Sequence, residues 1–111
     1  MNKKTMNKKT MNKNFDISDH LSMAAMLEQT AEEASELAQA SSKLARLYRG
    51  ENPVRKTESE CICDLTEEFA DVLLCLRYLA ENYKVVQYMN IDSVRLSKQD
   101  RLEKTLKNKG E

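Results

Sequence analysis

The sequence has very little of what β-rich, secreted or membrane proteins need. It contains two Gly, one Pro and no Trp among its 111 residues. Tight β-turns draw on Gly, Asn-Gly and Pro, so this scarcity argues against a hairpin-rich β fold and favours helices. No apolar run approaches the length of a membrane span, and the polar N-terminus lacks the apolar segment of a signal peptide. We therefore expect one small all-α domain in the cytoplasm.

Cysteine and histidine are also sparse. The three thiols of Cys61, Cys63 and Cys75 are an odd number, which argues against a disulfide framework and for a reducing compartment. Cys-x-Cys with a distant third Cys is one zinc pattern, but no fourth ligand is evident, and we expect these thiols to pack between helices. A di-iron bundle needs Glu-x-x-His motifs, which the single His20 does not supply.

Charges of the two signs balance overall but are segregated along the chain. Lys plus Arg equals Asp plus Glu, at 18 each. Residues 1–14, built on a tandem MNKKT repeat, hold five Lys and no acid. We predict a disordered basic tail there, interpreted as a duplicated start region rather than an electrostatic arm, and an all-α domain over 15–111. That domain is net acidic, so no stable nucleic-acid or membrane partner is expected.

Capping signals divide the domain into about three helices. The first should begin near Asp16 or Ser18 and end at Arg49-Gly50. The second should begin at the capping box that opens with Thr57, or at Asp64. Residues 84–90 fit a helix or an extended link equally well, and a last helix is expected over 93–107, capped by Asn90 or Asp92.

Apolar residues form a stripe on each of the first two helices. On the first helix the stripe comprises Met23, Met26, Leu27, Ala34, Leu37, Ala38, Leu44, Ala45 and Tyr48. On the second it comprises Ile62, Leu65, Phe69, Val72, Leu73, Leu76, Ala80 and Tyr83. Leu74 and Tyr78 lie on the opposite side of the second helix. A short chain buries a thin core, so this second patch predicts a homodimer, or a dimer of dimers, that completes a four-helix-bundle-like core.

Two acidic clusters stand out on these helices. Residues 32–36 read Glu-Glu-Ala-Ser-Glu, and residues 68–71 read Glu-Phe-Ala-Asp. Residues three or four apart share a helix face, so these carboxylates repel one another by roughly 0.2–0.5 kcal/mol per pair. No Lys or Arg occurs in 15–42 or in 57–76 to offset them. Two helices with unmixed charge suggest a shared cation, which for oxygen ligands means Mg²⁺, Mn²⁺ or Ca²⁺. On the first helix, Glu33 and Glu36 lie nearer the apolar stripe than Glu32.

The order E-E-x-x-E followed by E-x-x-D resembles the MazG-like all-α nucleoside triphosphate pyrophosphohydrolases. The resemblance covers about residues 23–82, with flanks that read EEASELAQA from Glu32 and EEFADVLLCL from Glu67. It implies hydrolysis of an NTP or dNTP to the monophosphate and pyrophosphate, with Mg²⁺ or Mn²⁺ as cofactor. By resemblance the metal ligands are Glu33, Glu36, Glu68 and Asp71.

The resemblance also implies outer residues. Glu32 is a candidate for a water-activating base or a group behind the ligands. Lys98 and Arg101, in the basic last segment, are the candidates for phosphate contacts, and Asn82 is the candidate for a base or sugar contact. The alternative is a non-catalytic helical dimer, an interaction or regulatory protein whose acids serve solubility or a basic partner.

Overall fold

The computed structural model describes residues 15–51 and 55–110. The predicted tail at 1–14 and the loop residue Pro53 lie outside these ranges. In the described part all regular structure is helical: a 3₁₀ turn η1 (Ile17–Asp19) and the helices α2 (Met23–Arg49), α3 (Glu58–Glu81) and α4 (Tyr88–Lys109). The prediction of an all-α chain with about three helices is confirmed. None of these helices combines the length and apolarity of a membrane span.

The first long helix begins later than its sequence signals suggested. Asp16 does act as a cap, but for the short turn η1, where its side chain accepts from the Ser18 backbone N–H. Helix α2 starts after Ser22, whose hydroxyl accepts from the Ala25 N–H at 3.1 Å. Its end is as predicted, because Gly50 adopts the left-handed conformation at φ 65° and its N–H returns to the Arg46 and Leu47 carbonyls.

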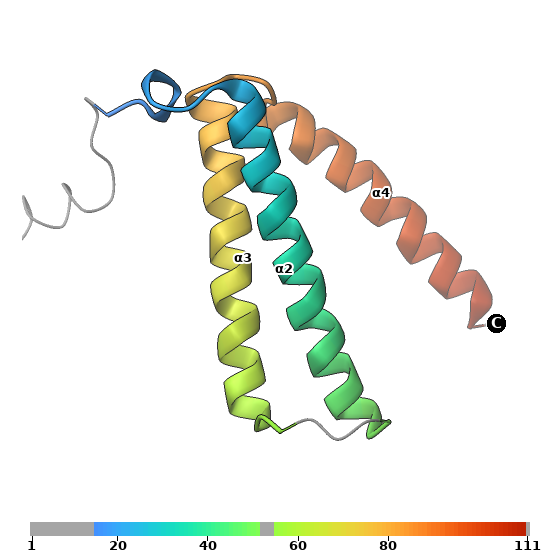
Figure 1. Cartoon of the computed structure of the whole chain (residues 1–111). Helices are drawn as coiled ribbons and strands as arrows, with labels where there is room; N and C mark the ends of the chain where they lie inside the picture. Colours follow the sequence, from blue (N-terminus) through green and yellow to red (C-terminus); the bar gives the residue numbers. More distant parts are fainter. Residues whose placement is uncertain (1–14, 52–54, 111) are drawn as a thin grey trace, which may run out of the picture.

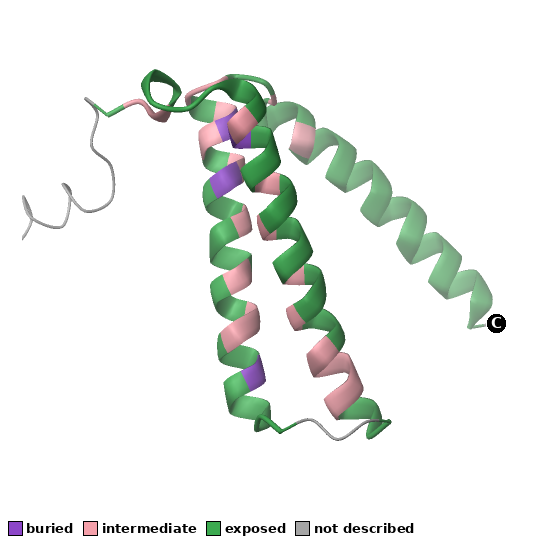
Figure 2. Cartoon of the chain, in the orientation of Figure 1, coloured by how far each residue is buried: buried purple, intermediate pink, exposed green. Residues whose placement is uncertain are grey.

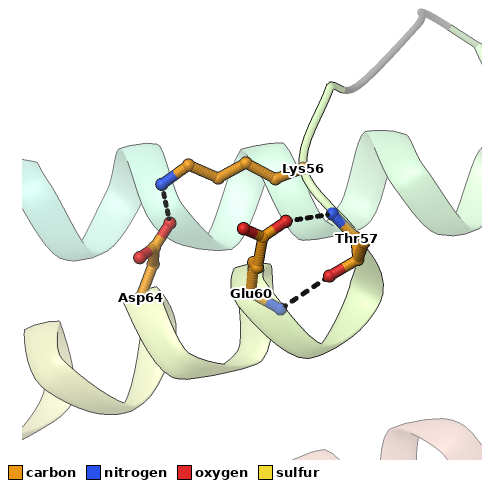
Figure 3. A network of polar contacts seen from close by, with 4 residues as sticks. All are labelled: Lys56, Thr57, Glu60 and Asp64. Carbon is orange, nitrogen blue, oxygen red and sulfur yellow. Dashed lines mark hydrogen bonds and ion pairs between the residues drawn. The ribbon is translucent and has the colours of Figure 1, made fainter.

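Helix α3 starts at the first of its two candidate positions. The Thr57 hydroxyl accepts from the Glu60 N–H, and the Glu60 carboxylate accepts from the Thr57 N–H at 2.9 Å, which is a complete capping box (Figure 3). This leaves Asp64 inside the helix rather than at its start. The box satisfies two backbone donors at once, which is why the earlier start is preferred.

Helix α4 is longer than predicted. It begins at Tyr88 with no side-chain cap, so the expected capping by Asn90 or Asp92 is wrong. Both residues lie inside the helix, and the Asn90 amide instead donates to the Gln87 side chain. Lys84, at φ 56°, turns the chain between α3 and α4, so the ambiguous segment is a link followed by the first helical turn.

Helices α2 and α3 form an antiparallel hairpin with a regular seam between them (Figures 1 and 2). The buried and half-buried residues along the seam recur in alternating steps of four and three, as in coiled-coil packing. On α2 they are Met26, Thr30, Glu33, Leu37, Ala40, Leu44 and Leu47. On α3 they are Cys61, Leu65, Glu68, Val72, Cys75 and Leu79, and Asn82 follows at the C-cap of the helix. Glu33 and Glu68 thus occupy positions that an ordinary pair of packed helices gives to apolar residues.

This seam coincides only in part with the predicted apolar stripes, because Met26, Leu37 and Leu44 of α2 and Leu65 and Val72 of α3 belong to both. Much of each stripe is exposed, including Leu27 at 44% and Leu73 at 60%. Cys75 and Leu79, which lay outside the stripe predicted for α3, are buried instead. The difference has a physical cause: apolar periodicity finds the most hydrophobic face, whereas this hairpin closes on one edge of that face and on the positions next to it, which include Glu33 and Glu68.

The core is small and lies at the end of the hairpin where α2 starts and α3 ends. Met26, Cys75 and Leu79 are buried together, and Ile17, Tyr78, Tyr83 and Val86 pack against them. The Tyr83 hydroxyl donates to the Leu21 carbonyl at 2.7 Å, which ties the N-terminal segment to the end of α3. Tyr78 is therefore covered by this chain, so of the second apolar patch predicted for dimer contacts, only Leu74 is exposed.

Helix α4 diverges from the hairpin and makes few contacts with it (Figure 1). All of its residues except Ile91 are exposed (Figure 2). Exposed ion pairs such as Lys104–Asp100 at 3.1 Å decorate it, each contributing about 0–1 kcal/mol. The described chain is thus a helical hairpin with one projecting helix.

Candidate metal centre

Four carboxylates meet near the middle of the α2–α3 seam. One oxygen from each of Glu33, Glu36, Glu68 and Asp71 lies within 4.8 Å of the others. Glu33 and Glu68 are half-buried in the seam, and Glu36 and Asp71 lie on its exposed side. One turn of helix separates the two acids on each helix, which places them on one face. The structure therefore brings together the four residues that the sequence proposed as metal ligands.

The electrostatics of this cluster are unfavourable for the protein alone. Burial raises the pKa of Glu33, and the charges of Glu36 and Asp71 raise it further, although the Gln29 amide, which donates to Glu33 Oε1 at 2.7 Å, opposes this. Burial likewise raises the pKa of Glu68, assisted by a carboxyl hydrogen bond with Glu36 and by the neighbouring charges. Both shifts show that the ionised acids are destabilised where they stand.

One carboxylate oxygen of each seam acid also lacks a partner. Oε2 of Glu33 and Oε2 of Glu68 are buried without a hydrogen-bond donor among the described residues. A buried polar atom without a partner costs about 1–3 kcal/mol, and more when it is charged. No basic side chain forms an ion pair with any of the four acids within the described ranges. A divalent cation bound to the cluster would satisfy these oxygens and reverse the repulsion.

The other predicted site residues lie outside the cluster. Glu32 is exposed, one turn before Glu36 on the solvent side of the cluster. Asn82 caps the C-terminus of α3, eleven residues and about 16.5 Å of helix beyond Asp71. Lys98 and Arg101 are exposed on the diverging α4. The structure thus groups the acids and leaves the three proposed substrate contacts apart from them.

Two cavities flank the cluster along the seam. The smaller one, of about 140 Å³, lies toward the start of α2 and includes Glu33 and Asp71 in its wall. Its other walls are mainly apolar and aromatic: Ile17, Leu21, Met26, Gln29, Leu74, Cys75 and Tyr78. The larger one, of about 740 Å³, lies toward the end of α2 and includes Glu36 and Glu68. The acids therefore form the ridge between an apolar cavity and a polar groove.

Sequence reasoning missed the residues that shape the polar groove. Lys43 and Arg46 line it together with small residues of α2, including Ser35, Ala38, Ala40 and Ser42. Helices α2 and α3 diverge toward this end of the hairpin (Figure 1), and the small side chains leave the groove open. The sequence signal that could have identified the groove cations was the position of Lys43, which follows Glu36 by seven residues.

Comparisons with known proteins give no match to this chain: no family model fits the sequence, and no curated protein or solved structure is significantly similar to it. The candidate site therefore stands on its own geometry and on the motifs described above.

Proposed function

We propose that this chain is a Mg²⁺-dependent nucleoside triphosphate pyrophosphohydrolase of the MazG-like kind, which cuts an NTP or dNTP to the monophosphate and pyrophosphate. The main observation behind this proposal is the convergence of Glu33, Glu36, Glu68 and Asp71 from two helices, with two buried oxygens that have no donor in the described part of the chain. The resemblance of both acidic motifs to that family supports the same proposal.

The donor set suits a hard divalent cation. Carboxylate oxygens are the ligands that Mg²⁺ and Mn²⁺ take in proteins, and the described cluster holds no His or Cys that would favour zinc or copper. Glu33, Glu36, Glu68 and Asp71 would hold the ion. When bound, it would neutralise phosphate oxygens and lower the pKa of a bound water.

The reaction balances with water as the only co-reactant. A water oxygen forms a bond to the α-phosphorus, and the bond from that phosphorus to the α,β-bridging oxygen breaks. The monophosphate keeps the new oxygen, pyrophosphate leaves with the bridging oxygen, and the protons of the water pass to solvent. Glu32, beside the cluster on its solvent side, is our candidate to accept the first proton.

We also propose that the protein works as a homodimer, through an apolar face other than that of Leu74 and Tyr78. At 100° per residue, the exposed members of the predicted stripes share the side of the hairpin opposite the acids. They are Met23, Leu27, Tyr48, Ile62, Phe69 and Leu73, each between 44% and 63% exposed. Pairing two such faces would bury them in a four-helix bundle.

The test of the reaction is a nucleotide panel. The purified chain is incubated with canonical, deoxy and modified triphosphates, with Mg²⁺ or with EDTA, and pyrophosphate and phosphate are measured separately. We expect Mg²⁺-dependent release of pyrophosphate and the monophosphate from at least one nucleotide. Release of phosphate and a diphosphate would contradict the proposed bond cleavage. A dimer with no turnover on any nucleotide would favour the non-catalytic interaction protein.

A further inference from the structure

The polar groove carries opposite charges at its two ends. Glu36 and Glu68 stand at the end nearest the acidic cluster, and Lys43 and Arg46 stand further along α2 toward its C-terminus. Lys43 follows Glu36 by seven residues, which is about two helical turns and about 10.5 Å along the axis. Both residues therefore lie on nearly the same side of α2 and face one groove. Its volume of about 740 Å³ falls within the range of about 300–1,000 Å³ for small-molecule sites.

The two cations have no anionic partner among the described residues. Neither the Lys43 nor the Arg46 side chain forms an ion pair or a hydrogen bond there, although both residues are half-buried. They are three apart on α2, so they repel each other by a few tenths of a kcal/mol, roughly 0.2–0.5. No acid lies three or four residues from either of them on α2. An anion in the groove would relieve this repulsion.

The third acid that lines the groove, Asp64, already forms an ion pair with another side chain. Asp64 lines the groove, but its carboxylate accepts from the Lys56 ammonium at 2.7 Å (Figure 3). The neighbouring Arg49 is likewise paired, with Glu51 at 2.8 Å. The groove therefore keeps two positive charges that no described residue neutralises, next to a cluster that would hold a divalent cation.

We propose that Lys43 and Arg46 form the anion subsite of this centre and bind the β- and γ-phosphates, the part of the substrate that leaves as pyrophosphate. This rests on the proposed function, which it deepens by giving the substrate a direction. The phosphate chain runs from the cluster along α2 toward Arg46. This direction leaves the nucleoside on the other side of the acids. Lys98 and Arg101, the candidates from sequence, do not line this groove.

The probe is inorganic pyrophosphate, measured by titration calorimetry on the full chain with Mg²⁺ present. Lys43→Gln and Arg46→Gln should each weaken its binding about tenfold, because each removes a charge-assisted hydrogen bond. The matched controls Lys98→Gln and Arg101→Gln remove the same charges from α4 and should change the Kd less than about twofold. Lys43→Arg should restore most of the affinity, and circular dichroism with a thermal melt checks that each variant is folded.

Kinetics give a second readout. With a nucleotide that turns over, the two α2 variants should raise KM more than they lower kcat, since phosphate contacts act in the ground state and the transition state alike. Wild-type affinity in both α2 variants, loss in the α4 variants instead, or no pyrophosphate binding to the wild type would overturn the subsite. Binding of pyrophosphate that needs Lys43 and Arg46 in a chain that neither binds Mg²⁺ nor hydrolyses nucleotides would keep the subsite and overturn the proposed reaction.

Discussion

Glu33 of α2 and Glu68 of α3 meet across the seam of the hairpin, each with one carboxylate oxygen that is buried and finds no donor in residues 15–51 and 55–110. They stand at positions where packed helices normally place apolar side chains. The pair separates the small core at one end of the hairpin from the buried Cys61 near the other. Two carboxylates that are destabilised by burial thus lie in the middle of the main packing surface between the two helices.

The first prediction concerns stability with and without metal. Glu68→Gln removes one charge from the repelling cluster, so in EDTA its thermal midpoint should equal or exceed that of the wild type. Addition of Mg²⁺ should raise the wild-type midpoint, because the ion binds only the folded state, and should raise the variant less. Glu67→Gln, at an exposed acid outside the cluster, is the control and should respond like the wild type. Identical midpoints with and without Mg²⁺ or Mn²⁺ in all three proteins would exclude the metal site.

The second prediction is a pH dependence of known sign. The pKa of Glu68 in the folded chain lies above its ordinary value of 4.5, so the folded state binds this proton more tightly than the unfolded state. The contribution of Glu68 to the free energy of unfolding of the metal-free protein should therefore fall as pH rises from about 4.5 through the raised pKa, and level off above it. Glu60, whose pKa is lowered by the capping box, acts with the opposite sign.

The difference between two proteins isolates the Glu68 contribution. Urea unfolding of the wild type and of Glu68→Gln in EDTA at pH 4.5, 6 and 8 should show the variant gaining relative stability toward pH 8. A constant difference across this range would mean that Glu68 ionises freely in the fold.

The third prediction ranks the acids in catalysis. Glu33→Gln, Glu36→Gln, Glu68→Gln and Asp71→Asn should each lower kcat/KM by orders of magnitude, because each removes a ligand of the charge-neutralising ion. Glu32→Gln should impair turnover but retain the Mg²⁺-induced rise in thermal midpoint, since its carboxylate lies outside the cluster. Full activity in any of the four ligand variants would remove that residue from the centre.

The fourth prediction tests the dimer with adjacent residues. Leu73 and Leu74 are similarly exposed, at 60% and 48%, but lie on different sides of α3. Leu73→Lys places a charge on the proposed pairing face and should shift the mass in light scattering toward the monomer value of 12.8 kDa. Leu74→Lys should leave the dimer intact. A wild type that is already monomeric at micromolar concentration would end the dimer proposal.

The fifth prediction concerns the end of α2. Gly50 holds φ 65° with open space around it, so Gly50→Ala meets no clash and pays only the backbone cost, about 1–2 kcal/mol. Gly110→Ala is the matched control: Gly110 has an ordinary φ of −73°, so its replacement should change the free energy of unfolding far less. Urea denaturation measures both, and equal effects would show that the left-handed cap does not govern the end of α2.

Helix ends that depend on a few adjacent residues could be predicted from the sequence. The capping box at Thr57 and the glycine stop at Gly50 could be identified from sequence, because each depends on a few adjacent residues. The start of α2 and the start of α4 were misplaced, because Asp16 caps a separate short turn and the link after Lys84 depends on contacts with the core. Element existence was therefore more predictable than element boundaries.

The candidate site was predictable in part for a similar reason. The four acids could be paired from two spaced motifs, and the structure brings them together. Which face of each helix closes the hairpin could be predicted only in part, since the most apolar face and the packed face overlap only partly here. The groove and its cations, Lys43 and Arg46, follow from that choice of face and from the divergence of two helices, neither of which is written in one segment.

The repulsion among the acids at the middle of the seam also affects how long the protein would persist in a cell. The apolar residues at the two ends of the seam favour packing of α2 against α3, whereas the acids at its middle repel one another. Under the proposed chemistry, a bound ion would hold the two helices together at that point. When divalent cations are scarce, the helices would separate more often and expose their inner faces to proteases. The abundance of this protein would then follow the ion supply, so that an enzyme without its metal is removed rather than stored.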